Sequence, residues 1–259
     1  MKRQITKWTL RLTAIGLLIL VFLIGIVLNP NLLYANKTPI GNYTIYHNSL
    51  LNKNLQQRLD DATELLKSSG LYDANLKLDI CLNDGSKYPA LIRTLRGDAF
   101  AWGFYDKVVF MGNANYIDNY VELNGYKWNF TQLLAHEIIH CFQFNKFGLL
   151  KSNPIAKIPE WKWEGFPEYV ARKNTDNNNL VSNIDRLLKT EKTVNNNWIL
   201  FDDSTGTVIS YYKNWLLLQY CLDIKKLTYH QLLNDTTSEL TTNVQMKKWF
   251  ANNQLMNQE

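Results

Sequence analysis

Cysteine and histidine are scarce in this chain, which has three cysteines and four histidines among 259 residues. The cysteines, Cys81, Cys141 and Cys221, are widely scattered. An odd number of cysteines without close spacing argues against a disulfide scaffold and against a cysteine-based metal site. We therefore expect all three to be small buried hydrophobic side chains.

A basic patch is also absent from most of the chain. The formal net charge is +5, but Lys2, Arg3, Lys7 and Arg11 supply four of these charges, and residues 1–28 contain no acidic residue. The remaining chain has 24 basic and 23 acidic residues, so it is close to neutral. No nucleic-acid partner is indicated by this distribution. The overall composition, 46% hydrophobic and 20% charged, is that of an ordinary globular domain.

The N-terminal segment has the features of a membrane or targeting element. Leu12–Leu28 follows a basic head and is mostly apolar, and its length lies near the lower limit of roughly 17–25 residues for a spanning helix. No clear signal-cleavage site follows, which favours a retained anchor over a cleaved signal that would leave a secreted domain. The preceding positive charges predict a cytoplasmic N-terminus and an extracytoplasmic domain. We assign residues 1–35 to the anchor and linker, with linker character extending over 29–42.

The remaining residues, 36–259, are expected to form a single α+β domain. An alternating pattern predicts a strand at Leu76–Leu82, and further short strands are expected at Tyr43–His47, Ala99–Tyr105 and Lys107–Met111, with a turn near Asp106 between the last two. Helical periodicity predicts helices at Leu51–Lys67, 86–96, Asn129–Asn145, 160–173, 180–190 and Val208–Leu222, and two short ones within 225–256. Strands come early and helices late, which predicts a small mixed or antiparallel N-terminal sheet followed by a mainly helical part.

The most specific pattern is His136-Glu137-Ile138-Ile139-His140. On a helix, positions four apart share one face, so both imidazoles can reach one point with Glu137 beside it. This arrangement suits two zinc ligands and a carboxylate that takes a proton from water. A pair of surface histidines is the alternative interpretation, but the motif uses two of only four histidines and lies on a helix with an apolar back. We therefore expect a Zn²⁺ site.

A catalytic zinc ion usually has three protein ligands and one open position. His47 and His230 occur in unremarkable contexts, so each is more simply interpreted as an ordinary surface or core histidine. Glu164, which lies 24 residues after the second motif histidine, is a better candidate for the third ligand. The alternative for Glu164 and Glu168 is an exposed acidic helix face.

His136-Glu137-x-x-His140-x-x-Gln143, followed by Trp-Glu-Gly-x-x-Glu-Tyr, resembles the gluzincin metallopeptidases, in particular the small peptidase-MA-like domains. The resemblance implies that Glu164 is the third ligand and that Glu168 holds a ligating histidine. Gly165 is expected to let its helix approach the zinc-motif helix closely. Pro167 departs from the family pattern, in which alanine is common, and is expected to kink the helix.

Gluzincins often supply a tyrosine or histidine downstream to hydrogen-bond the developing oxyanion, which implies a role for Tyr211 or Tyr212. Packing is an equally good interpretation of either side chain, because the chain contains 14 tyrosines.

These observations together predict a membrane-anchored, extracytoplasmic zinc metallopeptidase, a hydrolase of peptide or protein substrates. Zn²⁺ would be held by His136, His140 and Glu164, with Glu137 as the general base. The family analogy suggests strand addition of a peptide along Val108–Met111. One alternative is a membrane-tethered zinc-containing binding or assembly module without peptidase activity. Another is a zinc hydrolase that acts on a non-peptide bond.

Overall fold

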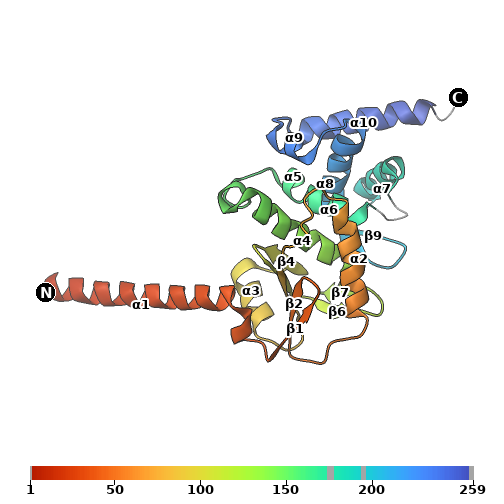
Figure 1. Cartoon of the computed structure of the whole chain (residues 1–259). Helices are drawn as coiled ribbons and strands as arrows, with labels where there is room; N and C mark the ends of the chain where they lie inside the picture. The colour runs from red at the N-terminus through yellow and green to blue at the C-terminus, as the bar shows by residue number, and fades with distance from the viewer. Residues whose placement is uncertain (1, 174–177, 194–196, 257–259) are drawn as a thin grey trace.

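The computed structural model describes residues 2–173, 178–193 and 197–256. Over these residues the chain is a mixed α+β protein, as predicted. A long helix, α1 (Lys2–Leu28), leaves one side of a body built from small sheets and helices (Figure 1). A 3-10 turn, η1 (Pro30–Leu32), follows it and leads into the body.

The central sheet has five strands and is mixed. Its order is β1 (Asn36–Ile40), β2 (Tyr43–His47), β3 (Leu78–Cys81), β5 (Lys107–Phe110) and β4 (Ala101–Phe104). The three middle strands, β2, β3 and β5, are parallel, whereas β1 and β4 pair antiparallel at the edges. Helix α2 (Leu55–Lys67) connects β2 to β3, and α3 (Tyr88–Arg96) follows β3.

The two faces of this sheet bury separate hydrophobic cores, because adjacent strand residues point to opposite sides. On one face, the larger core joins α2 and α4 (Phe130–Phe147) to the strand residues Ile45, Ile80 and Val108. On the other face, the smaller core joins α3 to the strand residues Tyr46, Cys81 and Val109. Helix α4, which carries the His-Glu-x-x-His motif, is therefore fixed against the sheet by its apolar side.

The end of α1 is attached to the smaller core. The Tyr88 hydroxyl donates to the Val27 carbonyl at 2.6 Å, and the Tyr34 hydroxyl donates to the Leu82 carbonyl at 2.7 Å. Within α1, the segment Trp8–Leu28 is long and apolar enough to cross a membrane, with a mean hydropathy of 2.7. A signal sequence satisfies the same criterion.

A three-stranded antiparallel sheet of β6 (Asn113–Asn115), β7 (Tyr120–Leu123) and β8 (Tyr126–Asn129) precedes α4. After α4 the described chain is mainly helical. The later elements are η2 (Leu149–Lys151), α5 (Glu160–Trp163), α6 (Gly165–Arg172), α7 (Leu180–Thr193), β9 (Trp198–Leu200), β10 (Gly206–Val208), α8 (Ile209–Gln219), the π-helical turn η3 (Tyr220–Ile224), α9 (Tyr229–Asn234) and α10 (Glu239–Met256). Helix α6 packs against both α4 and α8.

Several segments differ from the sequence-based prediction. Among the described residues, β1, which occupies part of the predicted linker 29–42, pairs with β2 alone, and such an edge strand tolerates Pro39. Strands β6 to β10, of three or four residues each, were not predicted. Helix α10 has 18 residues, whereas two short helices were predicted within 225–256. The three cysteines are free and buried, as predicted.

Candidate metal centre

Helix α4 presents the His-Glu-x-x-His motif and has well-defined ends. Asn129 caps its start, because the Asn129 side chain accepts a hydrogen bond from the backbone N–H of Gln132 at 3.1 Å. Gly148 ends the helix with a φ of 77°, which glycine adopts without strain. Ile138 and Ile139 of the motif belong to the larger core.

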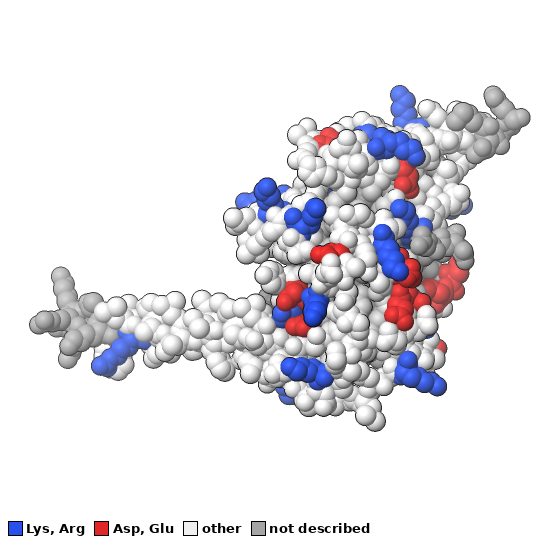
Figure 2. Space-filling model, in the orientation of Figure 1, with Lys and Arg blue, Asp and Glu red and all other residues white. Residues whose placement is uncertain are grey.

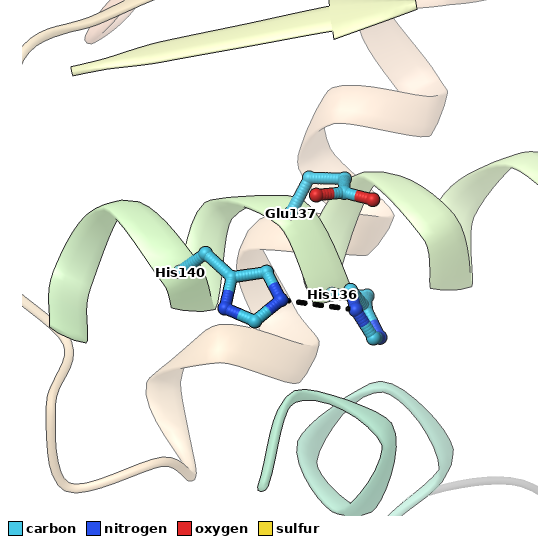
Figure 3. A group of neighbouring side chains, drawn as sticks. All are labelled: His136, Glu137 and His140. Atoms are coloured by element: carbon cyan, nitrogen blue, oxygen red, sulfur yellow. Dashed lines mark hydrogen bonds between the residues drawn. The ribbon is translucent and has the colours of Figure 1, made fainter. Parts of the chain in front are cut away.

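The two motif histidines lie on one side of α4, with the Glu137 carboxylate on the adjoining side (Figure 3). The Nε2 atoms of His136 and His140 are 3.2 Å apart, and the two residues are 4% and 6% exposed. The ligand atoms of these three residues lie within 4.8 Å of one another. Such a buried group can hold a metal ion.

Glu164, between α5 and α6, brings a carboxylate oxygen to the same point. Its Oε2 lies 3.4 Å from His136 Nε2 and 3.2 Å from His140 Nε2. Burial raises the pKa of Glu164, but the neighbouring histidines outweigh this effect and hold the pKa well below its usual range. The ionised carboxylate and the two imidazole nitrogens form a nearly equilateral triangle of donor atoms.

Glu168 orients the first histidine from behind. Its Oε1 lies 2.9 Å from His136 Nδ1, and its Oε2 accepts from Arg172 Nε at 2.7 Å. Burial raises the pKa of Glu168, but Arg172 and His136 outweigh it and lower this pKa. An ionised Glu168 accepts the Nδ1 proton of His136, and this leaves Nε2 to face the triangle.

The same carboxylates act on His136 itself. Burial lowers the pKa of His136, but hydrogen bonds to Glu164 and Glu168 outweigh burial and raise this pKa to about 10. Without a metal ion, His136 therefore carries a proton on each nitrogen. A metal ion at the triangle would displace the proton that faces it.

Gln143 holds the second histidine, a role that the sequence interpretation missed. Its Oε1 accepts from His140 Nδ1 at 2.8 Å, and its Nε2 donates to the Trp163 carbonyl at 3.2 Å and to the Tyr229 hydroxyl at 2.8 Å. The Trp163 carbonyl lies at the end of α5, where helix carbonyls have no donor within their own helix. The glutamine one turn after the motif was the available signal.

Replacing Gln143 with leucine is expected to weaken metal binding about 10–100-fold, as loss of a group that orients a ligand does. Leucine keeps the volume but no longer accepts from His140 Nδ1. The control is Tyr229→Phe, which removes a partner of Gln143 but keeps the ring stacked on Phe166 with centroids 3.7 Å apart. Metal titration of both folded variants tests the role, and equal affinity of Gln143→Leu and the wild type would contradict it.

The break between the two helices lies at Glu164 and not at Pro167, where a kink was predicted. Pro167 occupies the first turn of α6, where backbone N–H groups have no partner within the helix, so its missing donor costs little. The prediction for Gly165 was wrong as well. A Cβ atom there would lie 2.7 Å from the Asn214 carbonyl oxygen, so the close approach is to α8 and not to α4.

Glu137 is held by the edge strand β4. Its Oε2 accepts from the backbone N–H of Gly103 at 2.6 Å. A Cβ atom at Gly103 would overlap the backbone carbonyl of Glu137, so only glycine permits this approach of strand and helix. The carboxylate is therefore positioned by the backbone, beside the two imidazoles and outside the triangle.

Only one of the two candidate tyrosines lies beside the motif. The Tyr211 ring centroid is 5.8 Å from that of His136. The negative charge of Glu164, together with burial, raises the pKa of Tyr211 well above its usual value, so its hydroxyl stays protonated as a donor. Tyr212 points into the core, where its hydroxyl donates to Asn183 Oδ1 at 2.8 Å.

A cavity of about 400 Å³ opens beside His136, Glu137 and Tyr211. Aromatic side chains from several elements line it, including Phe100, Tyr126, Trp128 and Trp198. Cavities of roughly 300–1,000 Å³ are typical of ligand sites. The motif is therefore accessible to a ligand from the side that carries Glu137.

The remaining candidates lie elsewhere. His47 is bonded to Thr38 Oγ1 at 2.8 Å and to the Ser49 carbonyl at 2.8 Å. His230 is exposed on α9. Cys141, although next to His140 in sequence, donates from its Sγ to the Lys107 carbonyl.

Comparison of the chain with models of protein families, with curated proteins and with solved structures found no match. A functional assignment therefore rests on the residues of the site and on their geometry.

Proposed function

We propose that the chain is a membrane-anchored zinc metallopeptidase of the gluzincin type. The observation that carries the proposal is the spacing of 3.2–3.4 Å among the donor atoms of His136, His140 and Glu164. Zinc bonds of about 2.0–2.1 Å at tetrahedral angles place their donors about 3.3–3.4 Å apart. Three protein ligands leave the fourth position open, as hydrolytic zinc requires.

Zinc, when bound, would lower the pKa of a water molecule and polarise the scissile carbonyl. Glu137 takes the proton of the attacking water and later passes it to the leaving amine. The Gly103 N–H holds the Glu137 carboxylate in place by a hydrogen bond. Tyr211, which lines the cavity, supplies a hydroxyl donor for the developing oxyanion. Peptide hydrolysis at zinc uses a general base, a hydrogen-bond donor for the oxyanion and an open ligand position on the metal.

The free edge of β4 is the place for an extended peptide. Pairing along Val108–Met111, as first expected, is wrong, because β5 already has β3 on one side and β4 on the other. Among the strands that the structure describes, β4 pairs with β5 alone, and alternate residues of an edge strand direct their backbone groups outward. Among them, Gly103 already donates to Glu137 and Ala101 lines the cavity. A peptide added to β4 would thus lie beside the base.

Retention of α1 would place this site at a membrane surface. The proposal includes an extracytoplasmic body, because the positive charges lie before the span. The chain is expected to fractionate with membranes and to resist extraction by alkaline carbonate. A mature N-terminus near Asn36, found by N-terminal sequencing, would instead favour a cleaved signal and a secreted protein.

A zinc-containing binding or assembly module without activity is the main alternative, and a zinc hydrolase of non-peptide bonds is another. Intact Glu137 argues against a purely structural site, which has no use for a carboxylate that activates water. A peptidase assay of the wild-type chain beside Glu137→Gln discriminates these functions. Zinc-dependent peptide cleavage by the wild type alone supports the peptidase, whereas zinc binding without any cleavage of unstructured peptides contradicts it.

A further inference from the structure

The connection between α4 and α5 exposes an unusual number of aliphatic side chains. We define residues 148–158 as the exposed turn. Within it, Leu149, Leu150 and Ile155 are 58%, 77% and 50% exposed. Single exposed apolar residues are common, but three within one short turn make the turn a candidate interaction surface.

The polar groups of the exposed turn bond to one another. Ser152 is fully buried, and its Oγ donates to the Gly148 carbonyl at 2.9 Å. Asn153 exchanges two hydrogen bonds with the backbone of Ile158, at 2.8 and 2.7 Å. These bonds, with those from Lys151 N–H to the Gly148 carbonyl and from Ala156 N–H to the Ser152 carbonyl, reduce the number of polar groups that lose water when the tip of the turn enters the membrane interface.

The charge around the exposed turn is of one sign. Residues 138–159 contain Lys146, Lys151 and Lys157 and no acidic residue. All three lysines are exposed. In Figure 2, Lys and Arg side chains, without Asp or Glu, lie where Figure 1 places this turn. A patch of aliphatic tips surrounded by lysines is complementary to a bilayer with anionic headgroups.

The exposed turn also lies on the side of the body that would face a membrane crossed by α1. In Figure 1 the green turn that follows α4 projects toward the side from which α1 leaves. Tyr105, which is 65% exposed, lines a shared cavity with Leu149 and adds an aromatic ring of the kind found at membrane interfaces. The acidic neighbour in that cavity, Asp106, is paired with Lys107.

We propose that the exposed turn inserts into the same bilayer that α1 crosses. Leu149, Leu150 and Ile155 enter the acyl region, and the three lysines contact anionic phospholipid headgroups. The inference rests on the part of the proposed function that keeps α1 in a membrane. Two attachments, α1 and the exposed turn, would fix how the cavity beside Glu137 is oriented above the lipid surface.

The test uses the full chain in phosphatidylcholine vesicles with and without phosphatidylglycerol. An environment-sensitive fluorophore is attached at Leu150→Cys, since the three native cysteines are buried. The matched control is Leu240→Cys on α10, where the leucine is 74% exposed. A third label, at Leu18→Cys on α1, reports separately whether α1 lies in the bilayer. Lipids with a doxyl group on the acyl chain quench a label that contacts lipid.

The expected result is a blue shift of the label at position 150 and loss of most of its emission with doxyl lipid, with neither change at position 240. Each lysine near an anionic surface contributes about a fivefold preference, so phosphatidylglycerol should increase the quenching and Lys→Gln at 146, 151 and 157 should reduce it. A blue shift without doxyl quenching means that protein, such as a second copy, covers the turn, and it overturns the proposal.

Absence of any change at position 150 also overturns the proposal, whatever the label at position 18 reports. Absence of quenching at position 18 alone would contradict the anchor, and with it the shared bilayer, but would leave the proposed zinc peptidase chemistry standing. Zinc content and peptide cleavage by the variant labelled at position 150 should match those of the wild type, since this residue lies outside the metal centre.

Discussion

Replacing Glu137 with glutamine is expected to remove nearly all hydrolysis while the metal ion and the fold remain. Glutamine has nearly the same shape, and its side-chain oxygen still accepts from the Gly103 N–H, which lies 2.6 Å from the native carboxylate. It cannot accept the proton of the attacking water at neutral pH. Loss of a general base typically costs about 10²–10⁴-fold in rate, and the drop should appear in kcat for a cleaved peptide.

The matched control for this variant is Glu160→Gln, which makes the same change on an exposed residue one turn before Glu164. It should cleave at the wild-type rate. Zinc content, measured in parallel, separates the possible roles of Glu137. A Glu137→Gln protein that cleaves as fast as the wild type would show that Glu137 is not the base, and one that has lost its zinc would show that Glu137 is a ligand.

Alanine at position 164 is expected to weaken zinc binding more than a change at either neighbouring glutamate. Glu160, Glu164 and Glu168 are spaced by four, so a regular helix would place all three on one face. Four residues rise by about 6 Å, whereas zinc–oxygen bonds are about 2.0–2.2 Å long, so a single zinc ion can normally bind only one of them. The distances of 3.2 and 3.4 Å from Glu164 Oε2 to the two Nε2 atoms favour Glu164.

The comparison variants need care at position 168. Glu168 is 1% exposed and pairs with Arg172, which is 3% exposed. Removing one partner of a buried ion pair costs about 3–5 kcal/mol, so alanine at 168 disturbs folding as well as binding. Glu168→Gln keeps the packing and should weaken zinc binding about 10–100-fold. If Glu164→Ala binds zinc as tightly as the wild type while a variant at 160 or 168 fails, the assignment of the third ligand is wrong.

The sequence predicted those parts of the fold that have strong periodicity. The predicted strand at Leu76–Leu82 alternates and the helix at Asn129–Asn145 repeats clearly, and each appears close to its expected place. Strands β6 to β8 lie in a stretch without an alternating run of that length. Their pairing is decided by contacts between segments, which a single stretch of sequence does not contain.

The candidate site also has parts that the sequence predicts and parts that it does not. The spacing of His136 and His140 predicts that they meet, because a helix alone sets that geometry. The roles of Gln143 and Gly103 depend on how α4 meets the break before α6 and the edge strand β4. Gly165 shows the limit most directly, because a glycine predicts a close approach without identifying the partner. Here the partner is α8.

Zinc content of the purified full chain tests the central claim most directly. The chain is loaded with zinc, freed of excess metal and analysed by mass spectrometry beside a His136→Ala, His140→Ala double variant. Three ligands at tetrahedral spacing predict about one zinc ion per wild-type chain and almost none in the double variant. Well below half occupancy in the folded wild type, or equal zinc in both proteins, would contradict the account.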